Sequence, residues 1–463
     1  MSGLAWLARL VPFKGLLKRI LRSKEDRYVA LDTTASLLAQ ASMMFTTFAL
    51  VRLLILHLGE KKYGTWATLG SIVALVSLIQ IGVGPGLTNA LSHVSREHPE
   101  RGRPIVSSAL AIQVSVAALG SLLALGLLGG LELSQFIDLS ATEAESADLR
   151  AAFLILAVGS FLRLPTVIPG CVYRARLEGY KDSWIQVAGS LVFLAGAVLA
   201  LYLAPGLTSV SLAQQGGMLA YGLLSCLFLF RKYPELRPTF AAIDTDLTRK
   251  FLREGLHVSF VSIASYVTLS LDNVIISQLH GVEAVASYAA TMTLGQIGQR
   301  VTLRILDACW PMWSKALANG DLDWLQKHYR RTQRLIALVT FGSAAFMVVL
   351  GQFLVRIWTG SERVVPSTAL LWAIAALFVS LGLSSAPARL VLAAGAMNVV
   401  SRVAMVNAIV SALASIALGK AFGVAGVAWG TVVAYSLTTW VYVRFMRSHI
   451  RELAAKTPDI AGS

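Results

Sequence analysis

The strongest constraint in this sequence is a series of apolar stretches separated by short polar segments. A helix needs about 20 mostly apolar residues to cross a bilayer, because its backbone polar groups must be satisfied internally. A hydrophobic fraction of 56% with only 14% charged residues excludes an ordinary soluble protein of 463 residues. We therefore predict an all-α, polytopic membrane protein.

The apolar stretches predict about twelve transmembrane helices. They fall approximately at residues 29–57, 65–91, 105–130, 151–173, 185–204, 212–230, 256–280, 286–309, 333–357, 367–391, 402–421 and 424–446.

Lys and Arg residues concentrate in every second connection, which is the pattern that sets membrane orientation. With the N-terminus inside, the outer connections hold only Lys61, Lys62, Arg150, Arg356, Arg363 and Lys420. Both termini are therefore predicted to be cytoplasmic. The net charge of +15 is explained by this pattern, and no basic, aromatic-rich soluble segment exists to bind nucleic acid.

The connection after the sixth predicted span is the natural boundary between two halves. We predict five parts: a basic amphipathic cytoplasmic segment (1–28), a six-helix lobe (29–230), a cytoplasmic linker (231–255), a second six-helix lobe (256–446) and a cytoplasmic tail (447–463). None of the connections is long enough to fold as a soluble catalytic domain, and the chain contains no GxxxxGK[ST] motif for ATP.

An internal repeat supports the two halves. In residues 48–91 one apolar run is followed by a short polar turn and a second run, and residues 271–297 repeat this design with a slightly longer turn. The matching positions are His57 with His280, Gly59 with Gly281, Glu60 with Glu283, and Tyr63 with Tyr288. The repeat predicts two pseudo-symmetric six-helix bundles around a central cavity.

Arg163 is a charge that the membrane should not contain. It lies near the middle of the fourth span, and Pro165 and Pro169 interrupt the helical hydrogen bonding beside it. An arginine at this depth costs about 2.5–3.5 kcal/mol unless it has a partner or a wet cavity. We expect a helix bent around a cavity, or a kinked helix whose arginine is neutralised by a carboxylate.

The eighth span carries a polar stripe. Gln296, Arg300, Arg304 and Asp307 recur at helical spacing and share one face, which must point to protein or water. Arg304 and Asp307 are spaced to pair within the helix. Arg300 lies deeper and is the stronger candidate for binding.

Three further charges lie in the first spans of the two halves. Arg52 and Asp272 occupy comparable places and are spaced to pair across the pseudo-two-fold axis, as an outer gate or a bundle staple. Asp32 lies near the inner end of its span, where its carboxylate can reach water. The glycines of 82–86 and 423–430 allow close helix contact or local unwinding.

Repeated halves with polar faces on corresponding helices are typical of secondary transporters that work by alternating access. The charges inside the predicted bundle are mainly cationic, which suits an anionic solute such as a phosphate or pyrophosphate group. Cys171, Cys226 and Cys309 show no paired spacing, so neither a disulfide framework nor a metal site is predicted.

The sequence also resembles the polysaccharide (O-antigen type) flippases of the multidrug/oligosaccharidyl-lipid/polysaccharide (MOP) exporter superfamily, over essentially the whole chain in span count and topology. The residues that carry the resemblance are Arg52-Leu-Leu, Gly59, Tyr63-Gly64-x-Trp66, Ile81-Gly82-Val83-Gly84, Asp272, Gly281 and Ser287-Tyr288-Ala289-Ala290.

The resemblance implies a flippase, not an enzyme, in the bacterial cytoplasmic (inner) membrane. It would carry undecaprenyl-pyrophosphate-linked oligosaccharide to the outer leaflet, among membrane lipids and polysaccharide assembly proteins. Cavity arginines would hold the anionic head, with Arg163 and Arg300 first and Arg52 and Arg304 second. Asp272 and Asp32 would serve ion coupling or gating, with H⁺ or Na⁺ as the coupling ion and no other cofactor.

Three alternatives remain open. A multidrug/cation antiporter of the same superfamily would line its cavity with carboxylates. A membrane-embedded glycan polymerase or transferase would need a sizeable outer loop or clustered carboxylates, and the outer connections are short. A non-transporting partner in polysaccharide assembly would not depend on Arg163 or Arg300.

Overall fold

The computed structural model describes residues 24–76, 83–92, 94, 99–130 and 143–456. Most of the predicted amphipathic segment 1–28 lies outside these residues. The regular elements are all helical and comprise α2 (Lys24–Val76), α3 (Val83–Ser92), η3 (Pro99–Arg101), α4 (Gly102–Gly130), α5 (Glu143–Leu162), η5 (Leu164–Val167), α6 (Ile168–Ala175), α7 (Gly179–Leu203), α8 (Leu207–Lys232), η6 (Pro234–Leu236), η7 (Phe240–Ala242), α9 (Thr245–His280), α10 (Val282–Ala318), α11 (Leu322–Thr359), α12 (Thr368–Ala393) and α13 (Met397–Lys456).

Seven described helices, or eight if the bent pair α5–α6 counts as one span, are long and apolar enough to cross a membrane. Two of them are composite, because non-helical glycines break α2 at Gly59 and α13 at Gly423. Contacts across the second break show that the chain reverses there, since Ser411 Oγ lies 3.1 Å from Thr431 Oγ1. When α2 and α13 are each counted as two spans and α9 and α10 are included, the described helices give about twelve membrane crossings, as predicted.

The internal repeat is visible in the backbone. Gly59 has φ 82° and ψ 170°, and Gly281, between α9 and α10, has φ 82° and ψ 163°. This positive φ is readily adopted only by glycine. The helix restarts directly after the glycine in both copies, so the second turn is no longer than the first. Tyr63 and Tyr288 are both buried, but Tyr288 follows its glycine by about one extra helical turn.

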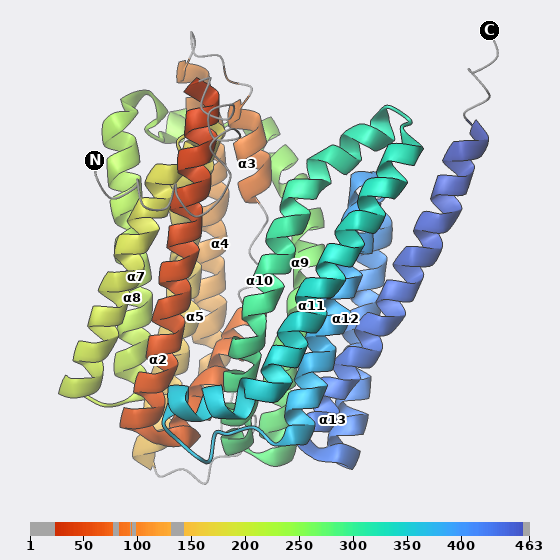
Figure 1. Cartoon of the computed structure of the whole chain (residues 1–463). Coiled ribbons are helices and arrows are strands. Elements are labelled where there is room, and N and C mark those ends of the chain that lie inside the picture. Colours follow the sequence, from red (N-terminus) through yellow and green to blue (C-terminus); the bar gives the residue numbers. More distant parts are fainter. Residues whose placement is uncertain (1–23, 77–82, 93, 95–98, 131–142, 457–463) are drawn as a thin grey trace, which may run out of the picture.

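Figure 1 shows two groups of helices, α2–α8 and α9–α13, which we call the N lobe and the C lobe. In the N lobe α7 packs between α2 and α8, and in the C lobe α12 packs between α11 and α13. We call the end that carries Lys24 and Lys456 the inner end, and the end that carries Gly59 and Gly281 the outer end.

The apolar cores differ between the two ends. Near the outer end one core cluster joins the lobes, since Leu54 and Tyr63 of α2 share it with Ala286 and Val355 of the C lobe. Near the inner end, one cluster is built from N-lobe helices with the start of α9, and another from α10 to α13. The lobes are therefore packed together at the outer end. Near the inner end, α10 to α13 have a core of their own, and the start of α9 packs with the N lobe.

The hairpin within α13 depends on close helix contact. A Cβ atom on Gly430 would lie 2.3 Å from the backbone nitrogen of Ser415, and one on Gly426 would lie 2.0 Å from the carbonyl oxygen of Leu418. The glycines of 423–430 thus provide both the local break and the close packing predicted from the sequence.

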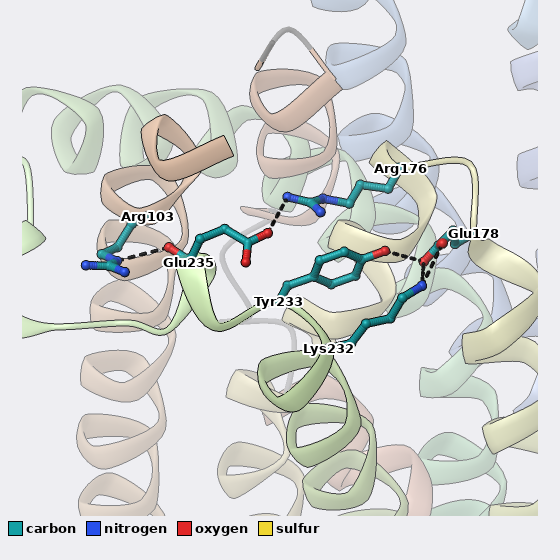
Figure 2. Close-up of polar contacts among 6 residues, drawn as sticks. All are labelled: Arg103, Arg176, Glu178, Lys232, Tyr233 and Glu235. Atoms are coloured by element: carbon teal, nitrogen blue, oxygen red, sulfur yellow. Dashed lines mark hydrogen bonds and ion pairs between the residues drawn. The ribbon is translucent and has the colours of Figure 1, made fainter. Parts of the chain in front are cut away.

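A cluster of charges ties the inner ends of α7 and α8 together (Figure 2). Lys232 Nζ lies 2.7 Å from Glu178 Oε1, and the Tyr233 hydroxyl donates to Glu178 at 2.6 Å. Lys181 Nζ lies 2.8 Å from Glu178 Oε2. Burial alone would raise the pKa of Glu178, but the hydrogen bonds from Lys181, Lys232 and Tyr233 lower it to about 2. The Glu178 carboxylate is therefore ionised at neutral pH and forms ion pairs with both lysines.

The connection that follows α8 is fixed to the N lobe. Arg176 forms a 3.4 Å ion pair with Glu235, and Arg103 Nε donates to the carbonyl oxygen of Glu235 at 3.0 Å (Figure 2). Further along, Asp244 N donates to Ser108 Oγ at 2.9 Å, just before α9 begins. The predicted linker is thus bound to the N lobe as far as Asp244.

Candidate functional site

A cavity of about 450 Å³ lies within the N lobe. Its walls come from α2, the bent α5–α6 segment, α7 and α8. The polar or charged side chains that line it are Thr46, Thr47, Arg163, Thr166, Arg174, Asp182, Gln186, Ser190, Gln214 and Tyr221, with Trp66 among the larger apolar ones. Such a mixed lining can hold a polar head group within a membrane protein.

Arg163 lies at the break that creates this cavity. The helix ends at Leu162, a 3₁₀ turn with Pro165 follows, and α6 leaves at an angle of 47°. Proline cannot continue the hydrogen-bond ladder, so the sequence dictates the break. The half-buried Arg163 side chain lines the cavity and donates towards the Met218 sulfur of α8. The prediction of a helix bent around a cavity is confirmed.

Two charged residues of this cavity were not predicted from the sequence. Asp182 on α7 is 5% exposed and accepts hydrogen bonds from the Tyr221 hydroxyl at 3.0 Å and from Gln186 Nε2 at 3.1 Å. Arg174 of α6 lines the same cavity near Asp182. Both were assigned to a polar connection, because α7 was predicted to begin at 185 and begins at Gly179. The i, i+4 spacing of Asp182 and Gln186 is the signal that could have revealed this polar face.

Asp32 is half-buried on α2 and faces the beginning of α7. A Cβ atom on Gly179, the first residue of α7, would lie 2.4 Å from Asp32 Oδ1. A carboxylate at a helix N-terminus is stabilised by the unpaired N–H groups there. Asp32 therefore has a structural contact, and its predicted role in coupling or gating stays a prediction.

Asp272 is buried in the C lobe, with 1% of its surface exposed. Its carboxylate accepts hydrogen bonds from the Tyr288 hydroxyl at 2.7 Å, from Thr431 Oγ1 at 3.0 Å and from Ser415 Oγ at 3.3 Å. These donors come from α10 and from both halves of α13, so Asp272 is the centre of a hydroxyl-lined site within the lobe.

The predicted pairing of Arg52 with Asp272 is wrong. Arg52 precedes Gly59 by seven positions, whereas Asp272 precedes Gly281 by nine, and two residues turn a helix by about 200°. The two side chains therefore point in different directions. Arg52 Nη1 instead donates to the carbonyl oxygens of Ile357 at 2.7 Å and Trp358 at 3.1 Å.

These contacts belong to a link between the lobes that we call the outer closure: Phe48, Arg52 and Glu60 of α2 with Ile357, Trp358 and Ser361 at the end of α11. Trp358 Nε1 donates to the Phe48 carbonyl at 2.8 Å, and the two rings lie 4.5 Å apart. Ser361 Oγ donates to Glu60 Oε1 at 2.6 Å. The last carbonyls of α11 have no partner within the helix, which makes them acceptors for Arg52.

Arg304 on α10 also reaches the other lobe, since its Nε donates to Gln40 Oε1 of α2 at 3.3 Å. The predicted pairing of Arg304 with Asp307 is wrong, because Asp307 forms its 3.0 Å ion pair with Arg389 of α12. Arg300, half-buried and one turn further out on the same face as Arg304, has no hydrogen-bond or ion-pair partner among the described residues. Of the four predicted arginines, Arg163 alone lines the N-lobe cavity, whereas Arg304 and Arg52 connect the lobes.

No group of three or more His, Cys, Asp or Glu side chains in the described part of the chain is placed to hold a metal ion. The candidate site is a polar cavity in the N lobe, and α10, which contacts α2 through Arg304 and Gln40, carries Arg300 one turn further out.

The fold is similar to that of solved membrane transporters. An inward-facing multidrug resistance MATE family transporter of the MOP superfamily superposes with a TM-score of 0.78, covering 91% of this chain and 100% of that structure at 13% sequence identity. The two-lobed helical architecture is thus that of MOP superfamily transporters.

The sequence identifies the protein family. Residues 32–317 match the Polysaccharide biosynthesis protein family, and the chain belongs to that family. It is 22% identical over 302 residues to the "Putative O-antigen transporter" of Salmonella typhi, covering 64% of this chain and 66% of that protein. It is also 22% identical over 321 residues to the "Putative O-antigen export protein" of Yersinia pseudotuberculosis, covering 68% of this chain and 71% of that protein. The chain thus spans about two thirds of the length of these relatives.

Proposed function

We propose that this multi-pass membrane protein is a flippase for undecaprenyl-pyrophosphate-linked oligosaccharide. It moves the lipid from the inner to the outer leaflet of the bacterial cytoplasmic membrane by alternating access, for export of cell-surface polysaccharide. Both termini are cytoplasmic in this proposal. Other polysaccharide assembly proteins supply the lipid-linked substrate and take up the product.

The observation that carries the proposal is the position of Arg163 at a proline-induced break that lines the N-lobe cavity. A guanidinium is always charged and matches phosphate oxygens with paired hydrogen bonds. An arginine at this depth lowers the cost of bringing a pyrophosphate out of water. The polyprenyl tail can stay in the hydrocarbon while the head group enters the protein.

The arrangement of the lobes supports alternating access. The shared core and the outer closure join the lobes at the outer end, whereas near the inner end α10 to α13 have their own core and can part from the N lobe. In our proposal the head group enters from the inner end, binds Arg163 and Arg300, and leaves after the outer closure opens. The division into 29–230, 231–255 and 256–446 supplies the two moving parts and their linker.

Asp272 is the residue we assign to ion coupling. It is a buried carboxylate surrounded by hydroxyl groups, a setting in which a proton or Na⁺ could be exchanged. Tyr288 on α10 and Thr431 on α13 are held against α9 by their hydrogen bonds to Asp272. Binding or release of the ion would therefore change how these helices pack.

A cation antiporter is the second candidate, and the buried Asp182 in the N-lobe cavity is the observation that favours it. The purified protein in proteoliposomes separates the two functions. Arg163→Ala and Arg300→Ala should each reduce flipping of a defined lipid-linked sugar at least tenfold, as expected when a charge-assisted contact is lost. Arg356→Ala, whose exposed side chain pairs with Glu362 in the same lobe, is the matched control.

Normal flipping by both alanine variants would overturn the site assignment. Electrogenic uptake of an organic cation, abolished by Asp182→Asn and unaffected by Arg163→Ala, would instead establish the antiporter.

A further inference from the structure

The exposed face of α11 changes character along its length. Near its inner end the exposed side chains are cationic: Lys327, Arg330, Arg331 and Arg334. Their spacing of three and four residues places them on one side of the helix. Further out the exposed side chains are apolar, with Leu338 72% and Val349 77% exposed. We call the four cations the α11 stripe.

Within the part of the chain that the structure describes, no carboxylate pairs with the α11 stripe. Among the described residues, none of its four side chains has a hydrogen bond or ion pair with a carboxylate, and Asp321 at the start of α11 is occupied by capping the Trp324 N–H at 3.1 Å. The inner end of the N lobe is different, because Glu178 and Glu235 pair with its cations (Figure 2). Four cations without an ion-pair partner among the described residues therefore lie on one side of the C lobe.

The position of the stripe along α11 matches the change from hydrocarbon to head groups expected in a bilayer. The apolar exposed surface begins at Leu335, directly after the last cation of the stripe. From Lys327 to Arg334 the helix rises about 10 Å. This length is comparable with the polar layer on each side of a hydrocarbon core of about 30 Å. Long Lys and Arg side chains at this level can reach lipid phosphates.

We propose that the α11 stripe binds the head-group phosphates of anionic phospholipids in the leaflet at the inner end. The continuity of the stripe with a lipid-exposed apolar surface on the same helix is the reason to choose a lipid over an acidic protein. Clustered Lys and Arg beside a membrane segment attract anionic lipids, and this attraction falls with ionic strength. The site belongs to the C lobe alone and does not depend on the proposed transport function.

Electron spin resonance with spin-labelled lipids tests this proposal on the full-length protein in phosphatidylcholine bilayers. The fraction of motionally restricted label gives the selectivity for phosphatidylglycerol over phosphatidylcholine at the protein surface. We expect the wild-type protein to prefer phosphatidylglycerol by about threefold or more at low salt, and to lose most of this preference in 0.5 M NaCl.

The test variant is K327Q/R330Q/R331Q/R334Q, and the matched control is R150Q/R356Q/R363Q/K420Q, which removes four cations of the predicted outer connections. The stripe variant should lose at least half of the selectivity, and the control should keep it. The milder R330Q/R331Q variant should lose a smaller part of the selectivity for phosphatidylglycerol. This variant keeps the test decisive if the fourfold variant does not fold. Equal selectivity in the stripe and control variants, whether both high or both low, would overturn the proposal.

Discussion

The outer closure provides the sharpest prediction about conformational change. Arg52 donates two hydrogen bonds from α2 to the last carbonyls of α11, so the contact exists only while the outer ends of the lobes are together. Replacing Arg52 by Ala removes both bonds without changing the core of either lobe. The variant should therefore shift the population towards the state that is open at the outer end.

The size of this shift follows from the contacts. A hydrogen bond from a charged group contributes about 1.5–3 kcal/mol. The Arg52 side chain is exposed, so screening places its net contribution near the lower end, at about 1.5 kcal/mol. Because 1.4 kcal/mol corresponds to about a tenfold change in an equilibrium constant, Arg52→Ala should increase the ratio of open to closed outer ends about tenfold.

Double electron–electron resonance measures this ratio directly. Spin labels at Ala204 and Lys420, exposed residues near the outer ends of the N and C lobes, report the separation in a background without the native cysteines. Arg356→Ala is the control, because Arg356 lies on the same end of α11 but pairs with Glu362 of its own lobe. Identical distance distributions for Arg52→Ala and Arg356→Ala would refute the reasoning.

Three further predictions concern packing, pH and coupling. Gly430→Ala places a Cβ 2.3 Å from the Ser415 nitrogen and should cost about 1–3 kcal/mol of stability, seen as a lower melting temperature in detergent. Glu178→Gln should lower the melting temperature at pH 7. The pKa of Glu178 is about 2 in the folded protein, below its ordinary value. The difference in melting temperature between the variant and the wild-type protein should therefore persist above pH 4.5 and vanish as the pH falls through about 2. A difference that grows towards low pH would contradict this assignment. Asp272→Asn should make the flipping rate in proteoliposomes independent of imposed H⁺ and Na⁺ gradients, and an unchanged gradient dependence would exclude Asp272 as the coupling residue.

Local signals in the sequence predicted the parts of the structure that depend on local chemistry. Apolar stretches of sufficient length predicted the spans, and Gly59 and Gly281 predicted the repeated turn because their backbone conformation favours glycine. Pro165 predicted the break beside Arg163, since proline in a helix interior removes a helical hydrogen bond.

The remaining site residues depend on contacts that no local pattern contains. The partner of Arg52 is a pair of backbone carbonyls at the end of a distant helix, and backbone acceptors leave no trace in a sequence. Arg174 and Asp182 fall in the predicted connection between the spans 151–173 and 185–204, because charged residues interrupt the apolar stretches there. Only the packing of α6 against α7 and α8 shows that both side chains line a cavity.

The central claim is that Arg163 recognises the charged head of a lipid substrate. Equilibrium binding of a short-chain prenyl pyrophosphate, compared with the corresponding neutral prenyl alcohol, tests it most directly on the purified protein. Our account predicts that Arg163→Ala weakens pyrophosphate binding by about 1.5–3 kcal/mol, about 10- to 150-fold, and leaves binding of the alcohol unchanged. Equal affinity of the wild-type protein and the variant for the pyrophosphate would contradict it.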